Sequence, residues 1–110
     1  FIRMSKYMRL LVMFDLPVTE PDDRKAASRF RQFLLHDGYY MIQFSVYVRI
    51  CNGLEAVEKH KLRLQQHLPH SGSVRMFVIT ERQFEAMQIL CGQKIPDVDE
   101  NKKENTVIVL

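Results

Sequence analysis

Residues 39–50, Tyr-Tyr-Met-Ile-Gln-Phe-Ser-Val-Tyr-Val-Arg-Ile, decide the fold class of this chain. The even positions are apolar: Ile42, Phe44, Val46, Val48 and Ile50. The odd positions include polar and aromatic residues: Gln43, Ser45, Tyr47 and Arg49. This alternation with a period of two predicts a strand whose even positions face the core and whose odd positions form a polar, aromatic face. Twelve residues are long for one strand, so two strands with a tight break near residues 43–45 are the alternative.

The segments before this stretch predict a strand followed by a helix. Residues 8–16 form a short apolar run that stops at a proline and carries Asp15 near its end, which favours a buried strand. A helix is expected over residues 20–37, with Thr19 as its N-cap and Gly38 as its stop signal. Its apolar side chains recur at helical spacing on one face: Ala26, Ala27, Phe30, Phe33 and Leu34.

A second helix, a strand and a short third helix are expected downstream. Apolar residues are interleaved with charged ones over residues 54–67, which predicts an amphipathic helix. Residues 74–79 are expected to form a strand, and residues 80–83 match a capping box. The short helix that this box opens is expected to carry three apolar side chains: Phe84, Met87 and Leu90.

The order of these elements, β-α-β-β-α-β, predicts a ferredoxin-like α+β sandwich with both longer helices on one face of an antiparallel sheet. We assign this domain to residues 1–92. Residues 93–105 are mostly polar and charged and are expected to form a linker. The apolar, β-branched residues 106–110 are expected to form an extra C-terminal edge strand, which joins the sheet of a second copy or of a partner protein.

The composition excludes several classes of protein. The chain has 110 residues, of which 46% are hydrophobic and 26% charged, which is the balance of one globular domain. Its two cysteines, Cys51 and Cys91, are too few for a disulfide scaffold and indicate a reducing compartment. No apolar run approaches the roughly 20 residues of a membrane span, and no signal peptide is visible, so a cytoplasmic location is expected.

The basic charge is concentrated in the body of the chain. The formal net charge is +3, but residues 97–110 hold four acids and two bases, so residues 1–96 carry a local charge of +5. This balance is compatible with a nucleic-acid or phosphate partner. The first predicted helix carries a basic cluster: Arg24, Lys25, Arg29 and Arg31. The cluster is either a solvated helix face or a surface that contacts phosphates without reading sequence.

Motifs for metal or nucleophilic chemistry are scarce. The glycines are isolated, so no phosphate-binding loop is present, and the two cysteines lie too far apart for a zinc finger. His60 and His67 lie seven positions apart on a predicted helix and are expected at the surface. Ser45 has no neighbouring histidine to support a catalytic triad. Asp15 differs, because a carboxylate at the end of an apolar strand either belongs to the following turn or marks a functional site.

Four stretches resemble the CRISPR-associated Cas-two family. Met8 to Pro17 is similar to the opening strand of these proteins with its acidic end, and Gln43 to Tyr47 is similar to their Gln-aromatic-Ser-Val-aromatic segment. Ser73 to Phe84 resembles their fourth strand and the Thr-Glu-x-Gln-Phe motif that follows it. Phe30 to Gly38 resembles the first helix of members found in type II systems. The resemblance extends from about residue 8 to residue 92, in the order and spacing of the family.

The resemblance implies a ferredoxin-like homodimer in which the strand-end aspartates of two subunits face each other and share one divalent metal ion, usually magnesium. The aspartate corresponds to Asp15 and the serine of the motif to Ser45, so these are the implied catalytic residues and Asp15 is the implied Mg²⁺ ligand. One carboxylate from each subunit suits a loosely held Mg²⁺ ion better than a two-metal centre. Some members carry an arginine shortly after the helix-ending glycine, where this chain has Tyr40-Met41, so no role transfers from that arginine.

The resemblance also implies what the protein acts on. Members of the family are metal-dependent endonucleases for RNA or for double-stranded DNA, or scaffolds that bind DNA with the Cas-one integrase during spacer acquisition. A stand-alone metal-dependent ribonuclease of the virulence-associated toxin type shares the fold and is an alternative, which gene neighbourhood would distinguish. A non-catalytic RNA-binding module would need glycine and aromatic residues on a central strand, and residues 74–80 lack that pattern.

Overall fold

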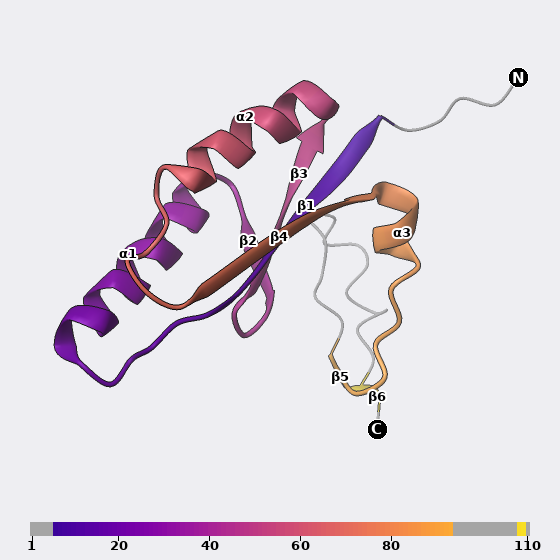
Figure 1. Ribbon diagram of the computed structural model, residues 1–110. Helices are drawn as coiled ribbons and strands as arrows, with labels where there is room; N and C mark the ends of the chain where they lie inside the picture. The colour runs from indigo at the N-terminus through magenta and orange to yellow at the C-terminus, as the bar shows by residue number, and fades with distance from the viewer. Residues whose placement is uncertain (1–5, 94–107, 110) are drawn as a thin grey trace, which may run out of the picture.

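The computed structural model describes residues 6–93 and 108–109. Its centre is a four-stranded sheet in which neighbouring strands are antiparallel and the strand order is β2-β3-β1-β4 (Figure 1). The strands of this sheet are β1 (Tyr7–Asp15), β2 (Tyr40–Gln43), β3 (Val46–Asn52) and β4 (Ser73–Thr80). The helices are α1 (Pro21–His36), α2 (Leu54–Gln65) and α3 (Glu81–Glu85). This arrangement confirms the predicted ferredoxin-like α+β fold.

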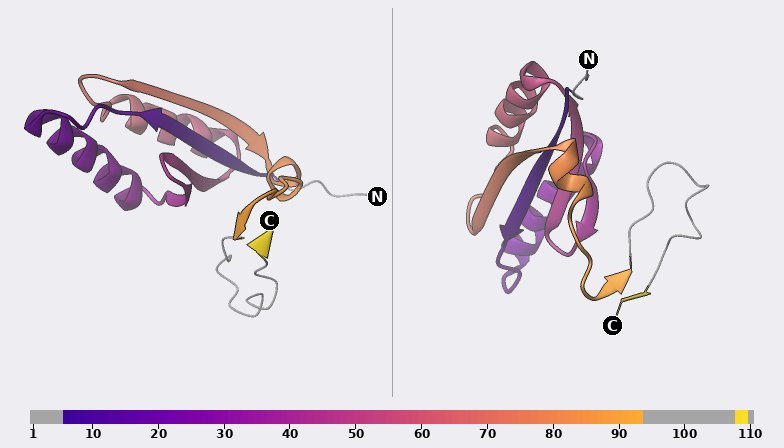
Figure 2. Two further views of the ribbon diagram at one scale, coloured as in Figure 1. Left: turned by 90° about the horizontal axis from the view of Figure 1, so that it is seen from below. Right: turned by 90° about the vertical axis from the view of Figure 1, so that its right-hand side faces the viewer.

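The hydrophobic core lies between the sheet and the two longer helices. Leu10, Val12 and Phe14 alternate along β1, are at most 8% exposed, and belong to one cluster with residues of α1 and α2. Phe30 and Leu34 of α1 lie one helical turn apart and join this cluster, and the Phe30 ring meets the Phe14 ring edge-on at 5.2 Å between centroids. β4 runs antiparallel beside β1 along its length (Figure 2). β1 is therefore the buried strand that its apolar run predicts.

Residues 39–50 form two strands rather than one. β2 ends at Gln43 and β3 begins at Val46, which confirms the alternative with a break near residues 43–45. Ser45 occupies the turn with a φ of 65°, a left-handed conformation that glycine adopts most easily. Because a serine takes this position, neither glycine nor proline marks the turn in the sequence.

The predicted assignment of the two faces of this stretch is wrong. Tyr47 and Cys51, at odd positions of β3, are buried in the core, whereas Phe44 is 87% exposed and Ile50 is 46% exposed. The pairing with β1 explains this result, because Tyr47 lies opposite Val12 and directly paired residues project from the same face of a sheet. The face away from α1 and α2, called the second face below, carries the even positions of β3: Val46, Val48 and Ile50.

The ends of α1 differ slightly from the prediction. Glu20 is the N-cap residue and its side chain makes no capping hydrogen bond, so the expected cap at Thr19 is wrong. Pro21 fills the first turn, where the missing N–H has no helical partner to lose. Asp22 and Asp23 place negative charge near the positive end of the helix dipole, which stabilises the helix start without a cap.

The short helix α3 begins with the predicted capping box. The Gln83 backbone N–H donates to Thr80 Oγ1 at 3.0 Å, and the Thr80 N–H donates to Gln83 Oε1 at 2.9 Å. The helix ends at Glu85, however, so Met87 and Leu90 lie beyond it and are exposed rather than on a helical apolar face. None of the described helices is long and apolar enough to cross a membrane.

The C-terminal strand is described only at β6 (Ile108–Val109), which pairs antiparallel with β5 (Gly92–Gln93) of the same chain. Residue 93 thus belongs to a strand, and residues 94–105 of the expected linker lie outside the described residues. That residues 106–110 join the sheet of a second copy or of a partner stays a prediction.

Candidate metal and nucleic-acid site

Asp15 is the last residue of β1 and lies exposed at the end of the sheet. The turn between β2 and β3 lies on one side of it, where the Phe14 backbone N–H donates to the Ser45 carbonyl oxygen at 3.0 Å. β4 begins on the other side, where Ser73 pairs with Asp15. The fold therefore brings Asp15 and Ser45, the two residues implied for catalysis, to the same end of the sheet.

Gly72 is a positioning residue for Asp15 that the sequence reasoning missed. Its φ is 95°, and a Cβ atom at this position would lie 2.7 Å from the Asp15 carbonyl oxygen and 2.8 Å from Leu16 Cδ2. Only glycine lets the chain entering β4 approach the end of β1 this closely. The available signal was a glycine two residues before the predicted strand. Such a glycine indicates a turn, but it does not show which other segment the turn contacts.

The described residues around Asp15 do not form a preformed metal site. Within residues 6–93 and 108–109, no group of three or more His, Cys, Asp or Glu side chains could hold a metal ion. No described cation forms an ion pair with Asp15 either. A carboxylate oxygen is the hard ligand that Mg²⁺ prefers, and Mg²⁺ keeps several waters when one or two carboxylates bind it. The Asp15 carboxylate is therefore a ligand of the kind that suits a loosely held, largely hydrated Mg²⁺ ion and is not part of a metal cage among the described residues.

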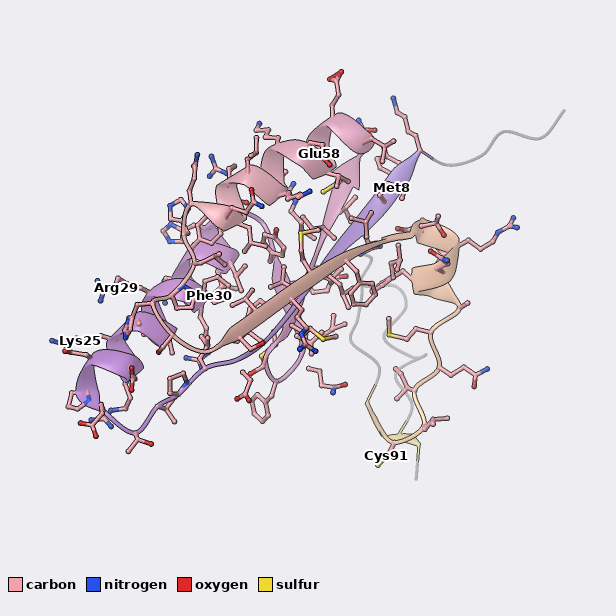
Figure 3. All side chains as sticks on the ribbon, in the orientation of Figure 1. Met8, Lys25, Arg29, Phe30, Glu58 and Cys91 are labelled. Carbon is pink, nitrogen blue, oxygen red and sulfur yellow. The ribbon has the colours of Figure 1, made fainter. Side chains whose placement is uncertain are left out.

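The four basic residues of α1 do not form one surface. Arg24 turns back to the loop before the helix, where its Nη1 donates to the carbonyl oxygens of Val18 at 3.1 Å and Thr19 at 2.8 Å. Lys25 and Arg29 are exposed and project from the same side of α1, while Phe30 points toward the sheet (Figure 3). Arg31 lies seven residues, about two helical turns, after Arg24, so these two residues share a face of the helix that differs from the face of Lys25 and Arg29. Arg31 is also only partly exposed. Lys25 and Arg29 are therefore the pair best placed to contact phosphates.

Arg9 fixes α3 on the second face. Its Nε and Nη2 donate to the two carboxylate oxygens of Glu81 at 2.6 and 2.8 Å, and its Nη1 donates to the Tyr40 hydroxyl at 2.8 Å. The Phe84 ring covers the guanidinium, with 4.2 Å between its centroid and Cζ. Hydrogen bonding to Glu81 raises the pKa of Arg9, and the same bonds lower the pKa of Glu81. Three apolar side chains elsewhere on this face are 36–46% exposed, whereas Leu11 and Val48 of the same face are buried: Met13, Ile50 and Phe77 are the exposed ones.

A buried polar cluster joins the end of α1 to β3 and α2. The Asp37 carboxylate accepts hydrogen bonds from His60 Nδ1 at 2.8 Å and from Arg63 Nε at 2.6 Å, and Arg49 donates to the Asp37 carbonyl oxygen. His60 is therefore buried, which corrects its expected surface position. His60 lies three residues after Val57 and four residues before Leu64, both on the buried face of α2. This spacing would have predicted from the sequence that His60 is buried.

The same region holds the Tyr39 hydroxyl, which is buried without a hydrogen-bond partner among the described residues. Burial, followed by the negative charge of Asp37, raises the pKa of Tyr39 above its ordinary range. Because Asp37 already engages the nearby cations, we interpret this cluster as one that stabilises the packing of the helices on the sheet.

Comparison with known proteins places these features in a family. Residues 8–87 match the family model described as CRISPR associated protein Cas2, which is the Cas-two family. The CRISPR-associated endoribonuclease Cas2 of Acidovorax ebreus is 52% identical over 103 residues, which cover 94% of this chain and 99% of that protein. Proteins with the same name from Ligilactobacillus salivarius and Campylobacter jejuni are each 41% identical, and the matches cover 93% and 94% of this chain and 100% and 73% of those proteins. With a family model matched over most of its length and relatives of this identity, the chain belongs to the CRISPR-associated Cas2 family.

Proposed function

We propose that this protein is a cytoplasmic CRISPR adaptation subunit, a homodimer that binds duplex DNA together with the Cas-one integrase during spacer acquisition. The position of Asp15 carries the proposal. An exposed carboxylate stands at the end of a buried strand, held between the Ser45 turn and the Gly72 approach, and no described cation neutralises it. The backbone contacts at Ser45 and Gly72 fix the position of Asp15, and its carboxylate has no described cationic partner. Such a carboxylate suits recruitment of a metal ion or of a second copy.

Magnesium-dependent cleavage of a phosphodiester is the second part of the proposal. Asp15 of each of two subunits would hold the ion, and Mg²⁺, when bound, would polarise the phosphodiester and favour attack by water. Ser45 would offer its hydroxyl to a phosphate oxygen at the same end of the sheet. The relatives are named endoribonucleases, which supports RNA as a substrate besides duplex DNA.

The exposed pair Lys25 and Arg29 supports binding to a nucleic-acid backbone. Two cations on one side of α1 neutralise phosphates without contacting base edges, so binding should be independent of sequence and should weaken steeply as salt rises. Duplexes of unrelated sequence should therefore bind about equally well.

Asp15→Asn tests the role of the carboxylate, because the amide keeps its shape and removes its charge. We expect this variant to lose magnesium-dependent cleavage of RNA and duplex DNA, to keep its fold, and to bind DNA with the integrase nearly as well as the wild type. Asp22→Asn is the matched control, since Asp22 is an exposed carboxylate in the first turn of α1, and it should retain every activity. Ser45→Gly removes the hydroxyl while relieving the positive φ, so it tests the hydroxyl without straining the turn.

Three outcomes would contradict this function. Full cleavage by Asp15→Asn would remove Asp15 from the chemistry. Loss of spacer integration by Asp15→Asn with an intact dimer would show that the scaffold and nuclease roles are not separable. Failure of the wild-type protein to bind the integrase would overturn the adaptation role itself.

A further inference from the structure

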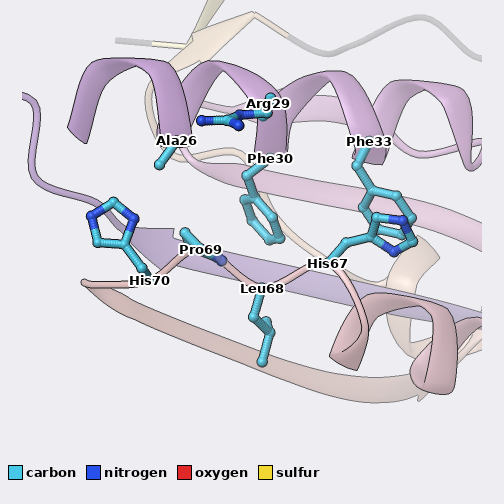
Figure 4. A pocket seen from close by; sticks show the side chains of 8 residues that line it. All are labelled: Ala26, Arg29, Phe30, Phe33, His67, Leu68, Pro69 and His70. Atoms are coloured by element: carbon cyan, nitrogen blue, oxygen red, sulfur yellow. The ribbon is translucent and has the colours of Figure 1, made fainter. Parts of the chain in front are cut away.

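A pocket of about 400 Å³ lies between α1 and the connection from α2 to β4 (Figure 4). This volume lies within the range of sites that take small molecules. Its lining is mainly apolar: Ala26, Phe30, Phe33, Leu68 and Pro69. Three side chains that carry or can carry positive charge complete the lining: Arg29, His67 and His70. Figure 4 shows His70 at one end, the stacked Phe33 and His67 rings at the other end, and Phe30 between them.

Each histidine has one ring nitrogen engaged by the protein. His67 Nδ1 lies 2.8 Å from the Arg63 carbonyl oxygen, which only accepts, so Nδ1 carries the hydrogen and Nε2 has no described partner. His70 Nε2 lies 3.2 Å from Asp23 Oδ1, so Nε2 carries the hydrogen and Nδ1 has no described partner. Each histidine therefore has a second ring nitrogen without a described partner, and the two histidines lie at opposite ends of the pocket.

The aromatic wall favours a flat ligand. The Phe33 and His67 rings stack with 4.1 Å between centroids and 11° between planes, and the buried Phe30 lies beneath the pocket between this stack and His70. Flat aromatic surfaces with polar groups at their edges match a nucleobase, which has two π faces and polar edges. Stacking of one base on aromatic side chains stabilises a complex by about 1–3 kcal/mol.

The charges at the pocket favour an anionic ligand. Arg29 lies on its α1 side and Lys25 projects from the same side of the helix. Asp23, the acid that lies beside His70, already accepts a hydrogen bond from that histidine. A phosphate attached to a bound base would therefore meet more positive than negative charge.

The pocket also adjoins the end of the sheet that carries Asp15. The connection from α2 to β4, which lines the pocket, continues from His70 through Ser71 to Gly72. Gly72 is the residue at which a Cβ atom would clash with the Asp15 carbonyl oxygen. A strand held at the pocket can therefore continue toward Asp15 along this short connection.

We propose that this pocket binds one unpaired nucleotide of a nucleic-acid strand, with the base against the Phe33–His67 stack and the phosphate beside Arg29. The inference rests on the proposed nucleic-acid function and adds a base-holding site on the helix side of the sheet. A peptide with an apolar anchor is the competing occupant, and the test below separates the two.

The test uses the full chain without metal and a single-stranded oligonucleotide that carries one 2-aminopurine, whose fluorescence falls when the base stacks. The wild type should quench this fluorescence, and His67→Ala should weaken binding about tenfold, within the range for one stacked base. His67→Phe keeps a flat ring and should retain most of the affinity. Arg29→Gln should weaken binding and reduce the slope of log affinity against log salt by about one.

Arg82→Gln is the matched control, because it removes an exposed arginine from α3, which packs on the second face of the sheet and not beside the pocket. Its quenching should equal that of the wild type. The proposal is overturned if the 2-aminopurine is not quenched, or if His67→Ala and Arg29→Gln lose no more than Arg82→Gln. Binding of the wild type to duplex DNA, measured on the same samples, tests the proposed function separately. If the duplex binds but the pocket variants behave like wild type, the pocket proposal is wrong and the proposed function stands.

Discussion

Gly72 and Gly53 share a backbone conformation but not their surroundings. Their φ angles are 95° and 96°, so a side chain strains the backbone at either position. A Cβ at Gly72 would clash with the Asp15 carbonyl oxygen, whereas a Cβ at Gly53 would meet nothing within 4 Å. Gly53 is thus required only by its φ, and Gly72 is required by its contact with the candidate site as well.

Comparing Gly72→Ala with Gly53→Ala isolates this contact. Both variants should lose about 1–3 kcal/mol of unfolding free energy because L-residues disfavour a positive φ. Gly72→Ala should lose at least about 1 kcal/mol more, since an overpacked position adds strain. Urea unfolding measures both losses, and amide NMR shifts at Asp15 should change only in Gly72→Ala. Equal losses with an undisturbed Asp15 would show that the close approach does not matter.

At the scale of elements, α3 has only five residues and depends on Arg9 for its place on the second face. Glu81→Gln tests this clamp, because it leaves the buried Arg9 guanidinium with a weaker partner. Hydrogen bonds to charged groups contribute about 1.5–3 kcal/mol, so a loss of that size is expected at pH 7. Glu85→Gln, an exposed change in the same helix, should cost little.

The pH dependence of the same variant has a definite sign. The pKa of Glu81 is lowered in the folded chain, so its charge stabilises the fold above the ordinary value of 4.5, and that stability is lost as the pH falls through the folded pKa. The difference in unfolding free energy between wild type and Glu81→Gln should therefore shrink below pH 4.5. A constant difference from neutral to acid pH would mean that the Glu81 charge is not what stabilises the clamp.

The elements also show what the sequence can and cannot predict. β1, α1, α2 and β4 each carry an apolar period of their own, so their positions were predictable. The buried face of β3 was not, because both of its faces carry apolar side chains and the register with β1 decides between them. Asp15 and Ser45 were found through family motifs, whereas Gly72 was missed because its role depends on a contact between segments far apart in the chain.

At the scale of the whole molecule, the two faces of the sheet are covered differently. α1 and α2 cover one face and bury the core, and α3 is clamped on the second face by Arg9. Met13, Ile50 and Phe77 stay 36–46% exposed on that second face. Apolar side chains of this size gathered on one face favour association with another apolar surface. Met13 and Asp15 are alternate residues of β1 and project from the same face, so pairing of two copies through this face would leave both Asp15 residues on the facing surfaces.

Phe77→Glu tests this homodimer directly. The charge would be buried without a partner in a dimer formed through the second face, so the variant should be monomeric at micromolar concentration while wild type has twice the 13.0 kDa mass of the chain. Leu62→Glu is the control, because Leu62 is 57% exposed on α2 rather than on the sheet. It should leave the mass unchanged. Light scattering gives the masses, and circular dichroism confirms that both variants fold. A monomeric wild type would refute the dimer, and a dimeric Phe77→Glu would place its interface elsewhere on the molecule.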